Sequence, residues 1–391
     1  MGLGCRPDED VVMIENVEAL RANGGLKWGY YDEDVLPAWV AEMDFGLAPA
    51  IADALHDAVT RGLTGYPYPA AEESVAVAAT WFWAERFGWS IDPRWVFPAP
   101  DVIQGGVRAI RHLTRPGSPV ILHSPVYFPF YGMVERAGRE VIEVRCPADH
   151  SGRFSLDLAG IEAGLAAGAG SVILCNPWNP TGRVLDETEL GDLIEVVRRH
   201  DARLIADEIH APIVYSGNVH TPVGKLDPEI VITVTSASKA WNLPGLKCAQ
   251  VVLTNEEDRS RWSEYFTPEK VGVGTFGLIA NAAAYGSSVD WFDGTLKRLE
   301  SNRDLFVELV AEHLPEAVCH PPQGTYLGWI DMTRYDLGDP TAFMLEVARV
   351  ALTSGGPFGR DAGQFARFNF ATDPSLIVEM VERMGQAVRA G

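Results

Sequence analysis

One lysine in this chain has the surroundings of a covalent cofactor site. Lys239 follows the β-branched run at residues 232–235, together with Ser236 and Ser238. A lysine that is desolvated and set beside other cations can form a Schiff base with an aldehyde such as pyridoxal phosphate. The two serines would then donate hydrogen bonds to the phosphate. A surface lysine after a strand is the alternative reading of an isolated Ser-x-Ser-Lys pattern.

Polar side chains also follow two apolar runs upstream. In CNPWNPTG, Asn176 and Asn179 stand beside prolines, and Asn179 could donate its amide to an aromatic oxygen. Asn-Pro pairs start turns, so a plain turn is the alternative. Asp207 ends the run LIAD, where an ionised carboxylate is costly unless a cation partners it. A protonated pyridine nitrogen would be such a partner and would keep the ring electron-poor, whereas a turn cap is the structural alternative.

Other residues could complete a site of this kind. Gly105 and Gly106 precede a helical pattern, and small residues there let backbone amides at a helix start approach a phosphate, although most Gly-Gly pairs are only turns. Lys247 offers a charge to the same phosphate. His210 could orient the ring oxygen or Asp207, or could simply be a buried histidine.

Two residues suit the ring face and the substrate. Tyr127, in HSPVYFPF, could stack on the ring, although an aromatic residue after a strand is more often part of the core. Arg367, in ARFNF, is flanked by apolar residues and is suited to bidentate capture of a substrate carboxylate. A solvated arginine at a strand edge is the alternative.

The elements that must position these residues alternate in type from about residue 96 to 255. Short apolar runs in SPVILHSP, GREVIEVRC, SVILCNP, ARLIADE, EIVITVTSAS and AQVVLT are separated by helical patterns such as residues 187–200. This alternation is typical of βαβ units on a parallel sheet, so the sequence predicts an α/β fold. Ligands bind at the carboxyl ends of such strands.

The chain divides by pattern into three parts. Residues 1–45 are rich in aromatics and turns and are expected to pack on a small domain. Residues 46–285 form the expected large domain with the mainly parallel sheet. After residue 285 a long amphipathic helix leads to further short strands and a final helix, so residues 286–391 are expected to form the smaller α+β domain.

Composition excludes several classes of function. The chain has 391 residues and a net charge of -21, from 53 acidic and 32 basic residues, which opposes nonspecific binding to nucleic acid or anionic membrane. No apolar run approaches the roughly 20 residues of a membrane helix, and we expect a cytoplasmic protein. The five cysteines form no CxxC pair and the nine histidines no HExxH motif, so neither a disulfide framework nor a metal site is expected.

These motifs resemble the fold-type I pyridoxal-phosphate enzymes, in particular the MalY/PatB group of cystathionine β-lyase-like C–S lyases. The landmarks are LPAWVAEMDF, GYPYP, SPVYFPF, NPWNPTG, ADEIH, SASKAWNLPGLK, QGTYLGW and RFNFAT, in the order of that group. The resemblance implies that the large domain has a mainly parallel sheet of the seven-stranded type. It implies that Lys239 carries the cofactor, that Asp207 pairs the pyridine nitrogen and that Asn179 contacts the ring oxygen. It also implies that Tyr127 stacks on the ring and that Arg367 holds the substrate carboxylate.

Two further implications concern the dimer and the substrate. Tyr66, in GYPYP, is expected to reach the phosphate of a neighbouring subunit, which implies a homodimer with shared active sites. Trp178 stands where many members of the group have histidine, and its bulk is expected to reshape the substrate pocket.

The resemblance implies β-elimination from an S-substituted cysteine, such as cystathionine or a specialised-metabolite conjugate, to a thiol, pyruvate and ammonia. Three alternatives stay open at the level of sequence. The same residues could serve an aminotransferase. They could also divert the substrate toward oxidative deamination with decarboxylation. Finally, folds of this type can act as regulators through partner binding.

Overall fold

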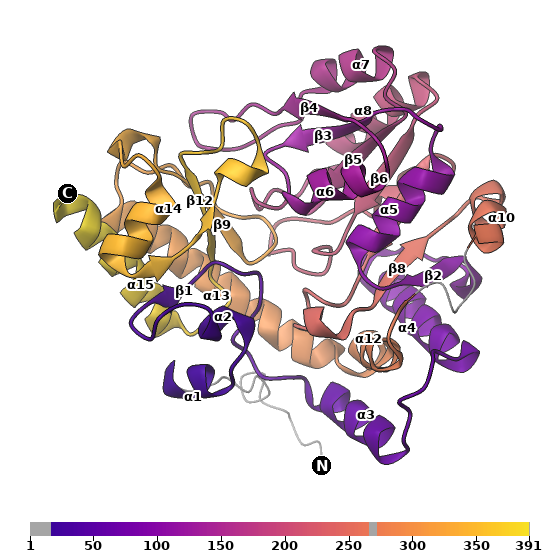
Figure 1. Ribbon diagram of the computed structural model, residues 1–391, viewed down its shortest axis with the longest axis horizontal. Helices are drawn as coiled ribbons and strands as arrows, with labels where there is room; N and C mark the ends of the chain where they lie inside the picture. Colours follow the sequence, from indigo (N-terminus) through magenta and orange to yellow (C-terminus); the bar gives the residue numbers. More distant parts are fainter. Residues whose placement is uncertain (1–16, 266–271, 391) are drawn as a thin grey trace.

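The largest sheet in the computed structural model has seven strands, within the described residues 17–265 and 272–390 (Figure 1). Its order is β2-β8-β7-β6-β5-β3-β4. Strands β3 to β7 are mutually parallel, and β8 runs antiparallel to both β7 and β2. The expected α/β class and mainly parallel seven-stranded sheet are confirmed. The strand bounds are β2 Val96–Ala99, β3 Val120–Ser124, β4 Val141–Arg145, β5 Ser171–Cys175, β6 Arg203–Asp207, β7 Val231–Thr235 and β8 Ala249–Val252.

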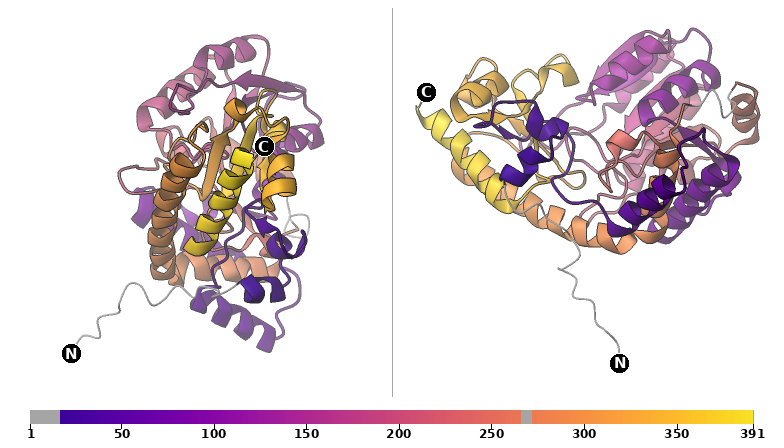
Figure 2. Two further views of the ribbon diagram at one scale, coloured as in Figure 1. Left: turned by 90° about the vertical axis from the view of Figure 1, so that its left-hand side faces the viewer. Right: turned by 60° about the horizontal axis from the view of Figure 1, so that its bottom comes forward.

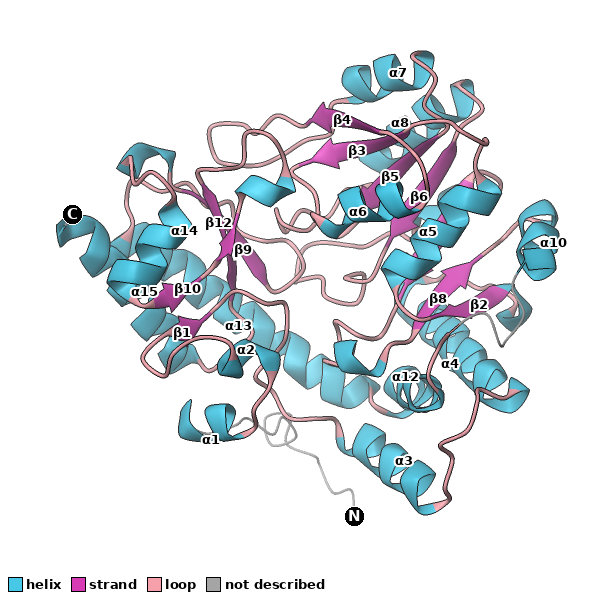
Figure 3. Ribbon diagram, viewed as in Figure 1, coloured by secondary structure: helices cyan, strands magenta, loops and turns pink. Residues whose placement is uncertain are grey.

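Helices cover both faces of this sheet (Figure 3). Neighbouring residues of a strand point to opposite faces, so Val120 and Leu122 of β3 pack with α5 (Val102–Leu113) and α6 (Pro129–Arg136). Ile121, between them, packs in the core with α7 (Leu158–Ala166) and α8 (Glu187–Arg199). Because both faces of the sheet are covered, the central strands β3, β5 and β6 carry consecutive buried apolar residues rather than alternating apolar and polar ones.

A second sheet is built from the carboxyl-terminal part of the chain. Strands β11 (Thr353–Ser354), β12 (Phe365–Asn369) and β9 (Leu327–Asp331) pair antiparallel, in that order. Helices α13 (Val289–His313) and α15 (Pro374–Ala390) pack against each other beside this sheet, and Figure 2 shows them side by side.

The amino-terminal segment joins this carboxyl-terminal part. Strand β1 (Leu36–Pro37) pairs parallel with β10 (Val350–Ala351), and Arg349 forms an ion pair with Asp34. Residues 1–16 of the expected segment 1–45 lie outside the described residues. The boundary expected after residue 285 falls near the end of α12 (Thr275–Ser287), and the three-part division stays a prediction.

The remaining elements are short or cover the periphery. They are α1 Val17–Ala22, α2 Leu26–Gly29, α3 Pro49–Thr60, α4 Pro69–Phe87, α9 Val223–Leu226, α10 Glu256–Tyr265 and α14 Pro340–Phe343, with single turns at Pro93–Trp95, Pro244–Leu246, Thr333–Tyr335, Met344–Ala348 and Gly356–Phe358. Among the described helices, none is long and apolar enough to cross a membrane. The four described cysteines, Cys146, Cys175, Cys248 and Cys319, are free thiols, and Cys5 lies outside the described part.

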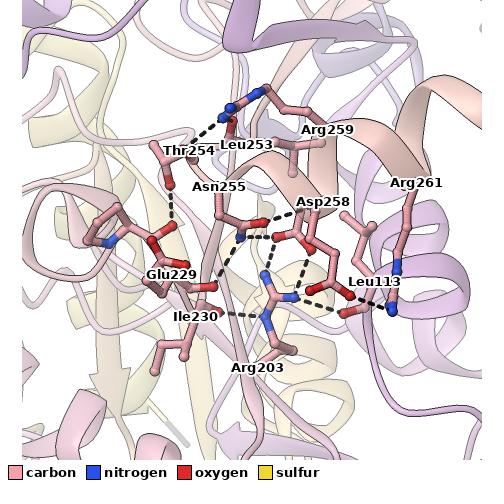
Figure 4. Close-up of polar contacts among 12 residues, drawn as sticks. Leu113, Arg203, Glu229, Ile230, Leu253, Thr254, Asn255, Asp258, Arg259 and Arg261 are labelled. Atoms are coloured by element: carbon pink, nitrogen blue, oxygen red, sulfur yellow. Dashed lines mark hydrogen bonds and ion pairs between the residues drawn. The ribbon is translucent and has the colours of Figure 1, made fainter.

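A buried ion pair ties α10 to the edge of the large sheet away from the strands' carboxyl ends (Figure 4). Arg203, at the start of β6, donates from Nη1 to Asp258 Oδ1 at 2.9 Å and from Nε to the Ile230 carbonyl at 3.1 Å. Asp258 is almost fully buried and also accepts from Asn255. These contacts therefore link α10 to β6 and to the residue that precedes β7.

We predict that Arg203→Ala lowers the free energy of unfolding by about 3–5 kcal/mol, because it leaves the buried Asp258 carboxylate without its cation. Chemical denaturation followed by circular dichroism measures the change. Arg199→Ala is the matched control, since Arg199 pairs with Glu162 at the surface and its removal should leave stability nearly unchanged. A loss for Arg203→Ala no larger than that of the control would contradict this prediction.

Candidate active site

The carboxyl ends of the parallel strands open into a cavity of about 280 Å³. Segments after β5, β6 and β7 meet there with the start of α5, with residues 39–41 and with the sheet of β11 and β12. The lining includes these predicted site residues: Tyr127, Asn179, Asp207, His210, Ser236, Ser238, Lys239, Lys247 and Arg367. Residues separated by up to 328 positions are therefore brought together, as the strand-end argument requires.

Lys239 lies buried at the centre of this set. Its Nζ donates to the carbonyl of Ala41 at 2.9 Å. Burial, with a smaller contribution from the positive charge of Arg367, lowers the pKa of Lys239 to about 8. A neutral, nucleophilic amine is therefore accessible near neutral pH.

Asp207 ends β6 and is buried. It accepts a hydrogen bond from the Ile209 amide at 3.0 Å. Burial raises the pKa of Asp207 to about 7, and nearby Glu208 adds to the rise. In the part of the chain that the structure describes, no cationic side chain forms an ion pair with Asp207. The site therefore has room for a cation supplied by a bound group.

His210 lines the same side of the cavity. Burial lowers the pKa of its imidazole well below the usual value, so the ring is neutral. Its Nδ1 is buried and finds no hydrogen-bond partner among residues 17–265 and 272–390. This nitrogen is available to a polar atom of a ligand.

Arg367 enters the cavity from β12. Its guanidinium donates to Asn179 Oδ1 at 3.2 Å, to the Trp39 carbonyl at 3.1 Å and to Thr353 Oγ1 at 3.1 Å. The guanidinium lies 5.3 Å from the Phe358 ring centroid, and burial lowers the pKa of Arg367 to about 10. Held only by neutral acceptors in the described chain, this buried cation is prepared to bind a carboxylate.

The opposite end of the cavity can receive an anion. Asp101 caps α5 by accepting from the Gln104 amide at 2.8 Å, and Val102 and Ile103 supply the first amides of the helix. Lys247 lies 3.2 Å from Asp101. Ser236 Oγ lies 2.7 Å from Ser238 Oγ and donates to the Cys248 carbonyl at 2.6 Å.

Gly105 and Gly106 correct the expected position of the helix start. Helix α5 begins at Val102, so the two glycines lie inside the helix and do not line the cavity. A Cβ on Gly106 would clash with Met133 of α6, and a Cβ on Gly105 would lie 3.0 Å from Val251 of β8. Their small size lets α5 pack closely on its neighbours, and the amides at the helix start come from the preceding residues.

Trp178 is also placed differently from expectation. Its indole is fully buried in the core beside α7 and α8, donates from Nε1 to the Pro125 carbonyl at 2.7 Å and meets His123 edge-on with centroids 4.4 Å apart. A large indole with its N–H satisfied is stable in such a core. The prediction that Trp178 shapes the substrate pocket is therefore wrong, because its side chain does not reach the cavity.

Tyr66 lies apart from the other predicted site residues. Its side chain is 91% exposed, in the turn between α3 and α4, beside a shallow depression formed with residues 273–276. The expected contact with a neighbouring subunit's phosphate stays a prediction.

Sequence reasoning missed the contribution of residues 39–41. Trp39 lines the cavity, and the Trp39 and Ala41 carbonyls hold Arg367 and Lys239. The WVAEMDF landmark was the signal in the sequence, but backbone carbonyls carry no residue signature from which this role could be inferred.

The cavity fits pyridoxal phosphate on three observations. It holds a buried carboxylate without a cation, a buried lysine whose pKa is lowered, and at its other end a helix start with two hydroxyls and a lysine. A cationic ring nitrogen, an aldehyde and a phosphate are the chemical complements of these groups.

Comparison with known proteins gives a consistent picture. The family described as aminotransferase class I and II matches residues 35–384. The cystathionine β-lyase of Corynebacterium glutamicum is 38% identical over 95% of this chain and 99% of that protein, and the cystathionine β-lyase PatB of Bacillus subtilis is 30% identical over 93% and 96%. A Corynebacterium diphtheriae structure, solved as a candidate PLP-dependent β-cystathionase, superposes with a TM-score of 0.91 at 39% identity, covering 97% and 99% of the two chains.

We predict that Asp207→Asn makes the ligand-free chain more stable than wild type, and that this gain in stability grows as the pH rises. The folded-state pKa of Asp207, about 7, lies above its ordinary 3.8, so wild type loses stability as the pH rises between these values. The melting temperature of Asp207→Asn should therefore exceed that of wild type at pH 8, and the difference should shrink toward pH 4.

Asp149→Asn is the control for this experiment. Hydrogen bonds from Ser151 and the neighbouring backbone hold the pKa of exposed Asp149 at about 2, so its effect should not change between pH 4 and pH 8. An Asp207→Asn difference that is equally independent of pH would show that the carboxylate is ionised throughout.

Proposed function

The chain belongs to the class I and II aminotransferase family, and on that premise we propose that it is a pyridoxal-phosphate-dependent carbon–sulfur β-lyase. The observation that carries the proposal is the cavity that buried Lys239, Asp207 and Arg367 line together without an ion pair between any two of them in the described chain. The relatives named as cystathionine β-lyases support the same activity for this chain over nearly its whole length.

Eight of the residues that line the cavity hold the cofactor in this proposal, together with the start of α5. Lys239 forms the covalent link, Asp207 pairs with the ring nitrogen, and Tyr127 stacks on the ring. Asn179 and His210 contact the ring oxygen. The start of α5, with Ser236, Ser238 and Lys247, binds the phosphate. When bound, pyridoxal phosphate supplies an electron-poor ring that takes up the negative charge developing at the substrate Cα.

Arg367 binds the substrate carboxylate and so fixes the amino acid in the cavity. Its fork of N–H donors matches a carboxylate, and its contacts with Asn179, Trp39 and Thr353 hold the fork in place before substrate arrives.

Lys239 is also the general base, a role that it would take once the substrate's amino group has replaced it in the link to the cofactor. With a pKa lowered to about 8, its amine takes the Cα proton at neutral pH more readily than an ordinary lysine would. Loss of that proton and cleavage of the Cβ–S bond release a thiol, and hydrolysis of the remaining three-carbon fragment gives pyruvate and ammonia.

An aminotransferase is the second candidate, because the matching family carries that description and the same residues would serve it. It would need a 2-oxo acid acceptor and would release no thiol. Oxidative deamination with decarboxylation would consume oxygen.

A homodimer and a cytoplasmic location are part of the same proposal. Tyr66 supports the dimer, because a tyrosine that is 91% exposed next to a depression in its own chain is free to contact a second chain. In the proposed dimer, Tyr66 donates its hydroxyl to the phosphate held by the other subunit.

The activity is tested with a panel of S-substituted cysteines, including cystathionine, with thiol, pyruvate and ammonia followed together. We expect the three products in equal amounts, without oxygen uptake and without a 2-oxo acid acceptor. Amino transfer to an acceptor without pyruvate would replace the proposal with the aminotransferase, and oxygen consumption would replace it with oxidative deamination.

We predict that Lys239→Ala abolishes product formation and removes the visible absorbance of the covalently bound cofactor, because no other buried amine lines the described part of the cavity. Lys297→Ala, at an exposed position of α13, should leave both unchanged. An unaltered absorbance band in Lys239→Ala would refute the assignment of Lys239.

A further inference from the structure

The amino-terminal segment contributes one aromatic side chain, Trp39, to the cavity wall, and two tyrosines pack on that side chain. Trp39 lines the cavity, and its indole is held by a hydrogen bond from Nε1 to the Lys27 carbonyl at 3.3 Å. Tyr30 and Tyr31 pack on Trp39 with ring centroids 5.0 Å and 5.7 Å away. Tyr30 is 64% exposed, so this aromatic surface extends from the cavity to solvent.

Apolar side chains also line the cavity on the side of α6. Phe128, at the amino end of α6, lines the cavity yet keeps 38% of its surface exposed. Phe128 packs edge-on against Phe358 at 5.3 Å, and Phe358 in turn lies beneath the Arg367 guanidinium. An exposed phenylalanine beside the proposed carboxylate site is a surface on which a ligand can bury apolar area.

Every charged side chain that lines the described cavity already has a partner or a role. Asp207 and Lys239 serve the cofactor in the proposed function, Arg367 serves the substrate carboxylate, and Lys247 and Asp101 pair with each other at the phosphate end. A substrate whose distal end carries a second ammonium and carboxylate, as cystathionine does, would find neither charge matched here. Desolvating such a pair without partners is costly.

We propose that the preferred substrates are L-cysteine conjugates with a neutral, apolar S-substituent of aromatic size, which packs between Trp39 and Phe128. This inference rests on the proposed lyase function and names its substrate class. Cystathionine is then a poor substrate of this chain, although relatives carry its name.

The test compares kcat/KM for S-benzyl-L-cysteine, S-methyl-L-cysteine and L-cystathionine in the holoenzyme. S-benzyl-L-cysteine should exceed cystathionine by at least about tenfold, a typical gain from filling an apolar pocket. Cystathionine turned over as well as S-benzyl-L-cysteine would overturn the substrate class and leave the lyase function intact.

Variants test whether Phe128 is responsible for the preference for an aromatic S-substituent. Phe128→Ala should lower kcat/KM for S-benzyl-L-cysteine by about tenfold, through KM, and change that for S-methyl-L-cysteine by less than about twofold. Tyr265→Ala, which removes an exposed tyrosine on α10, is the matched control and should change neither. Equal losses for both substrates in Phe128→Ala would overturn the assignment of the wall.

A binding measurement separates this inference from the proposed function. In Lys239→Ala protein supplied with pyridoxal phosphate, S-benzyl-L-cysteine should raise the melting temperature more than cystathionine does. That result without turnover of any substrate in wild type would refute the lyase and support the binding preference. An equal or larger shift with cystathionine would overturn the preference itself.

Discussion

The structure depends on burying charged groups in one cavity without ion pairs between them. Lys239, Asp207 and Arg367 line one cavity. Burial lowers the pKa of Lys239 and Arg367 and raises the pKa of Asp207, and each change favours the uncharged form of the side chain. Such groups destabilise a fold unless rigid surroundings hold them and a ligand supplies the missing partners. Here the described side chains and backbone offer these three groups neutral hydrogen-bond partners and no ion pair. The free-energy cost of burying the three groups is therefore offset when a molecule with complementary charges binds.

The rigid surroundings come from the large sheet and its two layers of helices. Because β3 to β7 are parallel, their carboxyl ends deliver polar loops to one edge of the sheet, while their apolar side chains fill the cores on both faces. Gly105 and Gly106 add to this rigidity by allowing α5 to pack closely, which sets the direction of its amino end toward the cavity. The chemistry and the packing thus share the same elements.

Much of this arrangement could be inferred from the sequence, for a definable reason. Asn179, Asp207 and Lys239 each follow a continuous apolar run, and the topology of parallel sheets converts that pattern into proximity. Arg367 was found because a charge between apolar residues is unusual. Two predictions were wrong: the position at which α5 begins, and the contact of Trp178 with the substrate pocket. The local sequence pattern determines neither the first residue of a helix nor the rotation of an indole into the core. The carbonyls of Trp39 and Ala41 were missed because their role arises from contacts across 328 and 198 positions.

Because these contacts join residues that are far apart in the sequence, the parts of the site become available one after another during synthesis. The Ala41 carbonyl accepts hydrogen bonds from both Lys239 and Tyr326. Both donors are synthesised long after Ala41, so neither hydrogen bond can form while Ala41 leaves the ribosome. Arg367 lies on β12, which comes after Lys239 and Tyr326 in the chain. A nascent chain that already contains the reactive lysine therefore still lacks its carboxylate clamp. The site becomes competent to bind an amino acid only after β12 has been synthesised.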